Sequence, residues 1–486
     1  MSPRITVAID PQLAPYRPEI DWTLRTIFSI IGYAWTEVPP GTTADIAYIG
    51  TDVSHATARV ALHADVRNWE RRRQLRLAGV DRKGNLATLG FAGGTNGRQE
   101  PWRRTATQLL CPHDYVFDVF WAITGQEERH LSHDKHGFTD LTGTVGHREQ
   151  FLLQATASGF AVWLQAQLID LGHPPGVPRW PGGRAAAAAM SHDVDYPEVK
   201  RWLEPARILV RQGLGGLSNA VQVAAGRRHH WQFPSWIKFE TTLGIRSAFY
   251  FVARCGSLLQ YAMGRPDPFY DIASDRFRQL FRQLADAGVE IGLHSSYDVY
   301  DSFERFKAEK ESLEHVSGQV VYGNRHHYLH LNPVDPEETL RLHERIGFRY
   351  DATLYHNAYV GFRRGLSHPF FPFHQADRSE IRTLQIPTAW MDDQLFGFRS
   401  HNPGEPRTLL RSLVDRVSQQ GGCLLVNMHE YVLDERLFPD WLSTLTDLWR
   451  CVIERGDYWL ATPREIADHW IARQSAILKC SAGLAS

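Results

Sequence analysis

The sequence predicts an α/β protein with two domains, and three observations support this prediction. The chain has 486 residues, more than one compact core normally holds. Between residues 184 and 473, apolar runs of strand length alternate with helical segments, which is typical of a parallel sheet, open or closed into a barrel. Polar residues follow four of these runs, where such sheets carry their catalytic groups. We therefore expect a smaller α/β domain over residues 1–180 and a parallel-sheet domain over residues 184–473.

The expected first domain begins with a short strand. Residues 4–10 and 44–50 are apolar enough to be strands, and residues 20–32 and 151–171 have apolar faces at helical spacing. The segment LGHPPGVPRWPGGR, residues 171–184, holds four prolines and four glycines, which interrupt helix and strand alike. This segment is the predicted domain boundary.

The expected second domain opens on five alanines and a methionine. Propensity alone would make this run a helix. However, Gly182 and Gly183 before it and a polar cluster after it leave too few residues for a stable helix, and small side chains fit a crowded barrel interior. We therefore expect a strand here. The predicted strands are 185–190, 247–253, 289–293, 319–323, 348–354, 384–390, 423–428 and 458–462, and helices are expected at 275–288, 300–318 and 335–347.

Composition and charge narrow the classes of partner. The 53 Lys and Arg residues nearly balance the 54 Asp and Glu residues, so no overall field attracts nucleic acid or anionic lipid. No stretch approaches the ~18 apolar residues of a membrane span, and the first 20 residues lack the apolar core of a signal peptide. Five scattered cysteines suit a reducing compartment. We expect a cytoplasmic protein without nucleic-acid partners; its oligomeric state stays open.

Four predicted strand ends carry candidate chemistry. The sequences are SHDVD at 191–195, HSSYD at 294–298, NRHHY at 324–328 and HE at 429–430. Each motif alone is weak, because an Asp-x-Asp commonly caps a loop and a single His is commonly structural. Their joint position at one edge of a sheet favours a metal site, and oxygen and nitrogen ligands suit zinc or another first-row divalent ion. The segment HLSHDKHG, residues 130–137, has metal-binding residue types too, but we expect it to be a solvated linker.

In order and spacing, these motifs resemble the polysaccharide deacetylase superfamily (NodB homology, similar to carbohydrate esterase family 4). Its members carry an Asp-rich motif, a His-Ser-x-x-His motif, an Arg-x-Pro-Tyr motif and a late Leu-x-His. The resemblance covers residues 184–473, including the closing YWLATPREIADHW, and fits a subgroup with a His-Asp-Val-Asp motif and an extra N-terminal domain. It implies a distorted (β/α)7–8 barrel of the NodB type.

The resemblance also implies a metal site. Asp193 matches the general base, and Asp195 and His294 match metal ligands. The second histidine of the second motif is replaced by Asp298, which could complete the site as a harder ligand. His327 stands where the third motif usually has proline and is the alternative third ligand.

Further roles follow from the same match. Arg325 matches an arginine that supports the catalytic carboxylates, and His429 matches the general acid. Asp351 matches the aspartate that orients this acid, with Asp392 or Asp393 as alternatives. Backbone N–H groups after the first motif, including that of Tyr196, are expected to help to hold the oxyanion.

The implied reaction is hydrolysis of an N-acyl group, in the first place N-acetyl, on a carbohydrate that belongs to surface-polysaccharide biosynthesis. It would need one divalent ion, zinc first, with cobalt, nickel or manganese as alternatives. Two other hypotheses stay open: hydrolysis of another linear or cyclic amide, as in allantoinase-like relatives, and a non-catalytic carbohydrate-binding scaffold, suggested by the missing histidine. Asp193, Arg325 and His429 together favour an enzyme, because a pure binder needs none of them at these positions.

Overall fold

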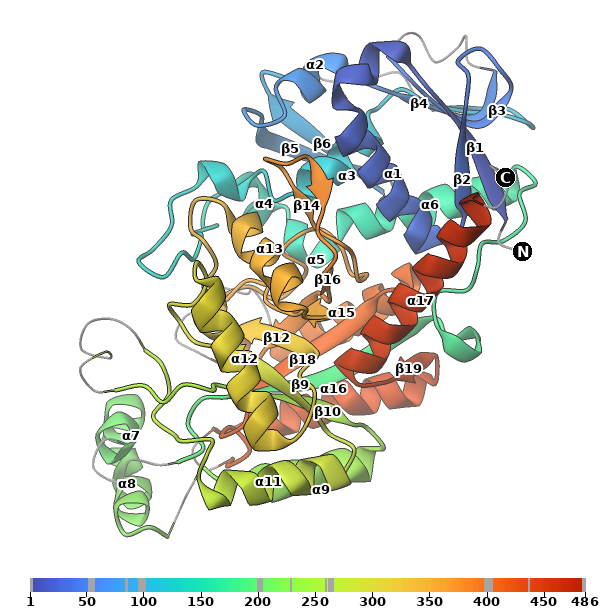
Figure 1. Cartoon of the computed structure of the whole chain (residues 1–486). Helices are drawn as coiled ribbons and strands as arrows, with labels where there is room; N and C mark the ends of the chain where they lie inside the picture. Colours follow the sequence, from blue (N-terminus) through green and yellow to red (C-terminus); the bar gives the residue numbers. More distant parts are fainter. Residues whose placement is uncertain are drawn as a thin grey trace.

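The computed structural model contains two large β-sheets with helices packed on them (Figure 1). It describes residues 3–482 except 51–56, 84–85, 95–101, 199–203, 228–229, 258–259, 261–265, 397–404 and 436–437. The first sheet is built from residues 4–111 and the second from residues 186–460. The N-terminal elements lie at the upper end of Figure 1 and the second sheet lies in its lower half.

The N-terminal sheet has the strand order β2-β1-β3-β4-β8-β7 and is parallel except at β7. Its strands are β1 (Arg4–Ile9), β2 (Ala34–Val38), β3 (Ala44–Ile49), β4 (Ala58–His63), β7 (Arg103–Arg104) and β8 (Leu109–Cys111). Other elements of this half are α1 (Arg17–Ile31), α2 (Val66–Glu70), the hairpin β5 (Arg76–Lys83) and β6 (Leu86–Ala92), α3 (Tyr115–Ile123), α4 (Val145–Arg148), α5 (Phe151–Gln154) and α6 (Thr156–Asp170). The predicted helix at 151–171 is divided into α5 and α6, because Ala155 adopts a left-handed conformation with φ of 44°.

The second sheet is parallel throughout. Its strands are β9 (Ala186–Val194), β10 (Ser247–Phe251), β11 (Glu290–Ser295), β12 (Gly323–His326), β13 (Tyr350–Asp351), β16 (Leu384–Gln385), β17 (Thr388–Met391), β18 (Cys423–His429) and β19 (Tyr458–Leu460). The helices between and after them are α7 (Glu204–Gln212), α8 (Leu217–Ala224), α9 (Phe233–Leu243), α11 (Asp275–Asp286), α12 (Phe303–Ser317), α13 (Pro336–Ile346), α14 (Asp393–Phe396), α15 (Pro406–Gln420), α16 (Trp441–Arg455) and α17 (Pro463–Ala482). A short hairpin of β14 (Phe373–His374) and β15 (Ser379–Glu380) follows β13.

This sheet closes on itself. β16 pairs with β13 at one end of the strand order and β17 pairs with β18 at the other. Only Ile386 and Pro387 separate β16 from β17, so they are two halves of one barrel strand, broken where proline has no N–H to donate. Counting them as one, and leaving aside β19 beside the first half of β9, the barrel has seven strand positions. The predicted barrel behind a smaller α/β domain is confirmed.

The alanine run forms β9, as predicted, and its residues face two different sides. Ala187 and Ala189 pack in the barrel interior with Tyr250, whereas Ala186 and Ala188 belong to the hydrophobic cluster beneath the outer helices. Side chains of a strand alternate between its two faces, so Ser191 and Asp193 continue the inward row. The barrel interior therefore leads directly to the polar residues at the end of β9.

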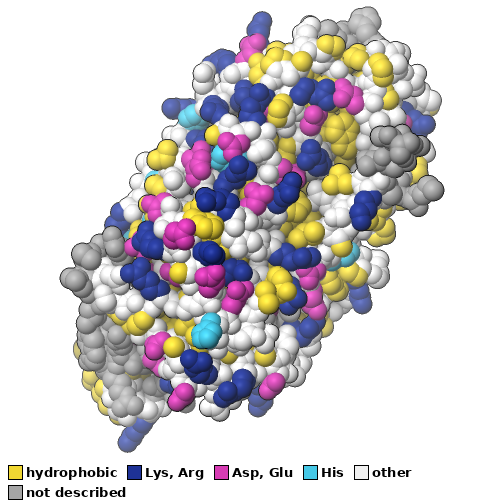
Figure 2. Space-filling model, in the orientation of Figure 1, with side chains coloured by type: hydrophobic (Ala, Val, Ile, Leu, Met, Phe, Trp, Pro, Cys, Tyr) yellow, Lys and Arg dark blue, Asp and Glu magenta, His cyan; other side chains and the backbone are white. Residues whose placement is uncertain are grey.

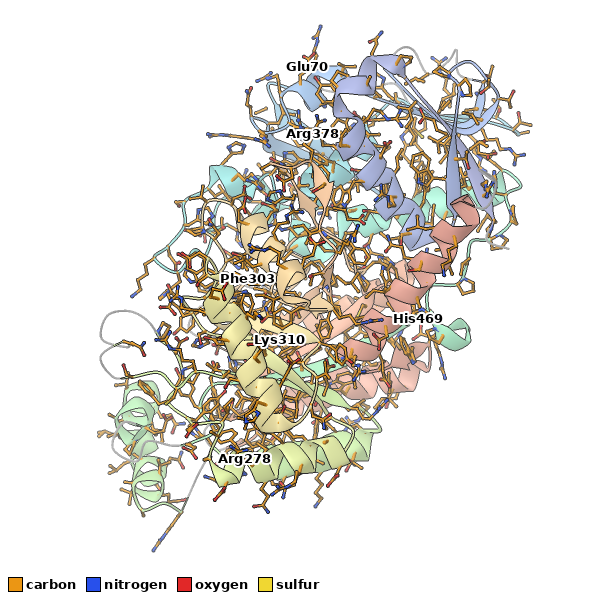
Figure 3. All side chains as sticks on the ribbon, viewed as in Figure 1. Glu70, Arg278, Phe303, Lys310, Arg378 and His469 are labelled. Carbon is orange, nitrogen blue, oxygen red and sulfur yellow. The ribbon has the colours of Figure 1, made fainter. Side chains whose placement is uncertain are left out.

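The two halves of the chain pack closely. One hydrophobic cluster includes Val7 and Trp22 of the N-terminal half together with Leu425 of β18. Arg378, in the turn between β14 and β15 (labelled in Figure 3), donates to Glu19 of α1 at 3.0 and 2.6 Å. Because the core is continuous, the domain limits at residues 180 and 184 stay a prediction.

The surface is of mixed charge. On the face shown in Figure 2, Lys and Arg side chains are interspersed with Asp and Glu side chains. Among the helices that the structure describes, none has the length and apolar character needed to cross a membrane.

Gly323→Ala is expected to destabilise the barrel. A Cβ at this position would lie 2.2 Å from the hydroxyl of Tyr350. That hydroxyl is held by Tyr250 at 2.9 Å and Glu290 at 2.7 Å, so it cannot move aside without loss. Overpacking of this kind costs ~1–3 kcal/mol of the free energy of unfolding, which urea titration measures.

The matched control for this prediction is Gly79→Ala. No atom lies within 4 Å of a Cβ built at Gly79, so this variant should unfold at nearly the wild-type urea concentration. Equal destabilisation of the two variants would contradict the close contact between Gly323 and Tyr350.

Candidate active site

The candidate active site is a cavity of about 180 Å³ at the carboxyl ends of the barrel strands. β9, β11 and β18 are parallel members of one sheet, so the residues that end them meet at one edge. Seven of the residues named from the sequence line this cavity: Asp193, Asp195, Tyr196, His294, His327, Asp393 and His429. Arg325 is fully buried and donates to Asp193, whereas Asp298, Asp351 and Asp392 do not line the cavity.

Asp195, His294 and His327 form a buried cluster of potential metal ligands. One ligand atom from each lies within 4.8 Å of those of the other two. The Nε2 atom of His294 is 3.4 Å from Oδ1 of Asp195, and the Nε2 atom of His327 is 3.7 Å from its Oδ2. The three residues come from the ends of β9, β11 and β12, as the strand-end pattern predicts.

Both histidines are oriented for metal binding. The Nδ1 atom of His294 lies 2.8 Å from the carbonyl oxygen of Arg325, and Nδ1 of His327 lies 3.3 Å from a carboxylate oxygen of Asp267. These partners only accept hydrogen bonds, so Nδ1 of each ring carries a proton and Nε2 faces the cluster. No motif in the sequence marks Asp267 for this role.

The cluster fits a divalent cation. Oδ1 of Asp195 and Nε2 of His327 are buried without a hydrogen-bond partner, which is rare for buried polar atoms. Burial lowers the pKa of His327, but the carboxylates of Asp195 and Asp267 outweigh it and raise this pKa to about 9, so positive charge is stabilised here. Two imidazoles and a carboxylate are the ligand types of zinc and other first-row ions.

Asp298 is not part of this cluster. Its carboxylate lies 3.6 Å from Arg254 and 3.4 Å from Arg305, and it does not line the cavity. The loop after β11 is fixed by hydrogen bonds from backbone N–H groups to Glu309 and Asp267, and this course directs Asp298 to the two arginines. Of the two third ligands that the sequence left open, the structure brings His327 to the cluster and not Asp298.

Asp193 is held by two donors. Its Oδ1 accepts a hydrogen bond from Arg325 at 2.8 Å, and its Oδ2 accepts one from Asn427 at 2.8 Å. Burial raises the pKa of Asp193, but Arg325, His294 and His429 more than compensate and lower it. The carboxylate is therefore ionised and fixed, with Oδ2 3.9 Å from Nε2 of His294.

Arg325 is locked in place as well. Its guanidinium also donates to Asn427 (2.7 Å), Ser191 (3.0 Å) and the carbonyl of Ala352 (3.2 Å). Asn427, two residues before His429 on β18, thus contacts both Asp193 and Arg325. Asn427 is a further site residue that the sequence did not predict, although its inward register on β18 is the same as that of His429.

His429 pairs with Asp392 rather than with Asp351. Nδ1 of His429 lies 2.8 Å from Oδ1 of Asp392, and its backbone N–H donates to Oδ2 at 2.7 Å. Burial lowers the pKa of His429, but Asp392 and Asp195 raise it well above its ordinary value. These carboxylates therefore favour the protonated ring, whose Nε2 is 3.6 Å from Asp195.

Asp351 has a structural role. It accepts hydrogen bonds from Asn324 and from the backbone and hydroxyl of Thr353, at 2.7 to 3.0 Å. Its place on β13, fully buried, keeps it with these partners. The expectation that Asp351 orients the acid is wrong, and the alternative Asp392 is the residue in contact.

The backbone N–H of Tyr196 already donates a hydrogen bond within the protein. It donates to Oε1 of Glu430 at 2.7 Å, and the N–H of Asp195 donates to Oε2 at 2.9 Å. The expectation that Tyr196 holds the oxyanion is therefore wrong in this arrangement. Glu430, the residue after His429, instead fixes the backbone that carries Asp195.

One wall of the cavity comes from the N-terminal half. Phe138 lines it, and its ring is stacked on Tyr328 with centroids 6.5 Å apart. His136 is buried, and its Nδ1 lies 2.9 Å from the hydroxyl of Tyr297, so residues 130–137 are not only a solvated linker. Tyr328 and Leu329 follow His327 with φ of 57° and 50°, a strained conformation of the kind that gathers at functional sites.

Comparisons with known proteins give similarity of structure only. No family model and no curated protein matches the chain. A Mycobacterium smegmatis protein assigned as a polysaccharide deacetylase shares 21% identity with a TM-score of 0.41, over 62% of this chain and 96% of its own. Puue allantoinase and a Pseudomonas aeruginosa PAO1 protein assigned as a polysaccharide deacetylase also match 62% of this chain. Each shares 18% identity with a TM-score of 0.42, and the match covers 95% and 96% of their own chains, respectively. At these identities and TM-scores, function must follow from the side chains of the cavity.

Proposed function

We propose that the protein is a metal-dependent hydrolase that removes an N-acyl group, in the first place N-acetyl, from a carbohydrate. The observation that carries this proposal is the meeting of three parts in one cavity: the carboxylate of Asp193, the cluster of Asp195, His294 and His327, and His429 with its partner Asp392. Base, metal ligands and acid are the components of metal-assisted amide hydrolysis.

The residues divide the proton transfers between them. A divalent ion bound by the cluster would polarise the amide carbonyl and lower the pKa of water. Asp193 accepts the proton of the attacking water, and Arg325 and Asn427 hold its carboxylate in position. His429 donates a proton to the departing nitrogen, because an amide does not readily expel an unprotonated amine.

The size of the cavity defines what enters it. Pockets that enclose a drug-sized ligand measure ~300–1,000 Å³, and this cavity measures about 180 Å³. An acyl group and its nearest ring fit, and the rest of a longer glycan stays outside. We place the substrate among cytoplasmic precursors of a surface polysaccharide.

Acetate release tests this proposal. Purified protein, with its metal content measured on the same sample, is incubated with N-acetylated amino sugars in free, oligomeric and lipid-linked form, and with small cyclic amides. Release of acetate from a sugar supports the proposal. Ring opening of a cyclic amide alone would establish the other hydrolase hypothesis, and glycan binding without hydrolysis of any amide would establish a scaffold.

Asp392→Asn is expected to lower kcat with little change in KM, because Asp392 orients His429 and does not line the cavity. Asp351→Asn is the comparison variant, and its kcat should stay near that of wild type. Steady-state kinetics on the best substrate measures both, with thermal melting to confirm folding. A loss of kcat in Asp351→Asn but not in Asp392→Asn would reverse the assignment.

A further inference from the structure

α7, α8 and the turn Gly213–Gly216 between them form a helical hairpin, residues 204–224, inserted between β9 and β10. In Figure 1 the two helices stand out from the barrel at the lower left. Their own small core consists of Ile208, Ala220 and Val223. The hairpin therefore packs mainly on itself and leaves its outer side to the surroundings.

Both helices and the turn of this hairpin expose large apolar side chains. Val210 is 86% exposed, Leu214 is 89% exposed, and Leu209, Leu217 and Val221 are exposed by 37 to 58%. These five make up half of the large apolar side chains that are exposed in the described part of the chain. Scattered single apolar residues are ordinary on a surface, but a group of five marks an interaction site.

The charge of the same segment differs from that of the whole chain. The chain is nearly balanced, yet residues 200–230 contain six Lys and Arg residues and one Glu. Within the hairpin the sequence places Arg207 and Arg211 in α7, and Arg227 is exposed just after α8. Apolar side chains on a basic helical segment are typical of helices that lie in the interface of an anionic membrane.

The base of the hairpin adjoins the cavity. Glu204 at the start of α7 lies 3.8 Å from His230, which follows α8. The Nδ1 atom of His230 is 3.1 Å from the carbonyl oxygen of Tyr196, and its ring is stacked on Tyr431. Tyr196 and Tyr431 both line the cavity. The hairpin is therefore connected to the cavity wall through the contacts of His230 with Tyr196 and Tyr431.

We propose that residues 204–224 attach the protein reversibly to an anionic lipid surface and bring the cavity to substrates held there. The exposed apolar side chains enter the interface, and the positive charge of the segment attracts it to lipid phosphates. Resting on the proposed function, this inference names the substrate class as an N-acylated glycan on a lipid carrier, whose acylated sugar reaches a cavity too small for the rest of the molecule.

Vesicle sedimentation tests the attachment. Full-length protein is mixed with vesicles of phosphatidylcholine alone or of equal parts phosphatidylcholine and phosphatidylglycerol. We expect at least tenfold stronger partitioning to the anionic vesicles, falling as salt is raised. Val210→Glu combined with Leu214→Glu should reduce partitioning at least tenfold, whereas the control, Val320→Glu combined with Val334→Glu, changes two exposed valines elsewhere and should bind like wild type.

Three results would overturn the proposal: no binding to anionic vesicles at low salt, equal loss in both double variants, or a dimer of the full chain that the hairpin variant alone dissociates. Hydrolysis of a water-soluble N-acetylated sugar should be the same in wild type and the hairpin variant. If no amide is hydrolysed but the vesicle results hold, the proposed function fails and the attachment stands. If an amide is hydrolysed but the protein does not bind anionic vesicles, the attachment fails and the proposed function stands.

Discussion

His327→Ala should lose the divalent ion after dialysis, whereas Asp298→Ala should retain it at full occupancy. Nε2 of His327 faces Asp195 without a hydrogen-bond partner, and its removal leaves only one imidazole and one carboxylate at the cluster. Asp298 is paired with Arg254 and Arg305 outside the cavity. Metal analysis of the dialysed proteins measures the effect, and His294→Ala should behave like His327→Ala.

A graded variant separates metal binding from folding. Asp267→Asn keeps the shape beside His327 but removes the charge that orients its ring, so affinity should fall by ~10–100-fold, not completely. Added metal should raise the melting temperature of wild type and Asp298→Ala but not of His327→Ala, because only a bound ion stabilises the folded state. Metal loss in Asp298→Ala with retention in His327→Ala would restore the direct match to the second motif.

The strand-end rule explains why the sequence predicted so much of this site. Asp193, Asp195, His294 and His429 each follow or end an apolar run, and parallel strands bring their carboxyl ends to one edge whatever the details of the loops. The same register argument placed the alanine run in a strand, since its inward residues lead to Asp193. Local pattern and global fold agree at these positions.

The residues that the sequence missed lie on loops or contact the site through partners distant in the chain. Asp267 reaches His327 from a loop 60 residues earlier, and no periodicity marks such a contact. The choice of Asp351 over Asp392 depended on which of two buried carboxylates faces His429, which only tertiary packing decides. Tertiary packing also explains why the role expected for Tyr196 is wrong, because its backbone N–H donates a hydrogen bond to Glu430.

The predicted strand boundaries are wrong where polar residues extend a strand or where a proline divides it. The run expected at 319–323 was too early, since β12 spans Gly323–His326 and includes Arg325. The run expected at 384–390 is split at Pro387 into β16 and β17. In the first case the functional polar residues are themselves strand residues, fully buried and hydrogen-bonded inside the barrel.

Asp193→Asn should keep the metal and lose turnover by ~10²–10⁴, the range of a general base. The amide preserves the shape and can accept from Arg325, but it cannot take a proton from water. The substitution also places an NH₂ group opposite the NH₂ group of Asn427, which now donates to Oδ2. A loss of ~1–3 kcal/mol in the free energy of unfolding is expected from that lost hydrogen bond, so urea titration accompanies the kinetics.

Asn427→Ala is the matched control for this stability effect. It removes the same hydrogen bond, together with the one that Asn427 accepts from Arg325, but leaves the carboxylate, which Arg325 still holds at 2.8 Å. Its turnover should therefore fall much less than that of Asp193→Asn even at an equal or larger loss of stability. Equal turnover in the two variants would show that the position of Asp193 matters and its basicity does not.

His429→Ala should also lose turnover by ~10²–10⁴ with the metal retained, because it removes the group assigned to protonate the departing nitrogen. His429→Gln fills the same space and can donate to Asp392, so it tests the proton transfer in a folded site. Substrate affinity should change little in either variant, since neither Asp193 nor His429 is assigned to bind the sugar. If Asp193→Asn and His429→Gln both release acetate at the wild-type rate, amide hydrolysis takes place elsewhere; if only one of them is slow, the slow residue identifies which proton transfer limits the reaction.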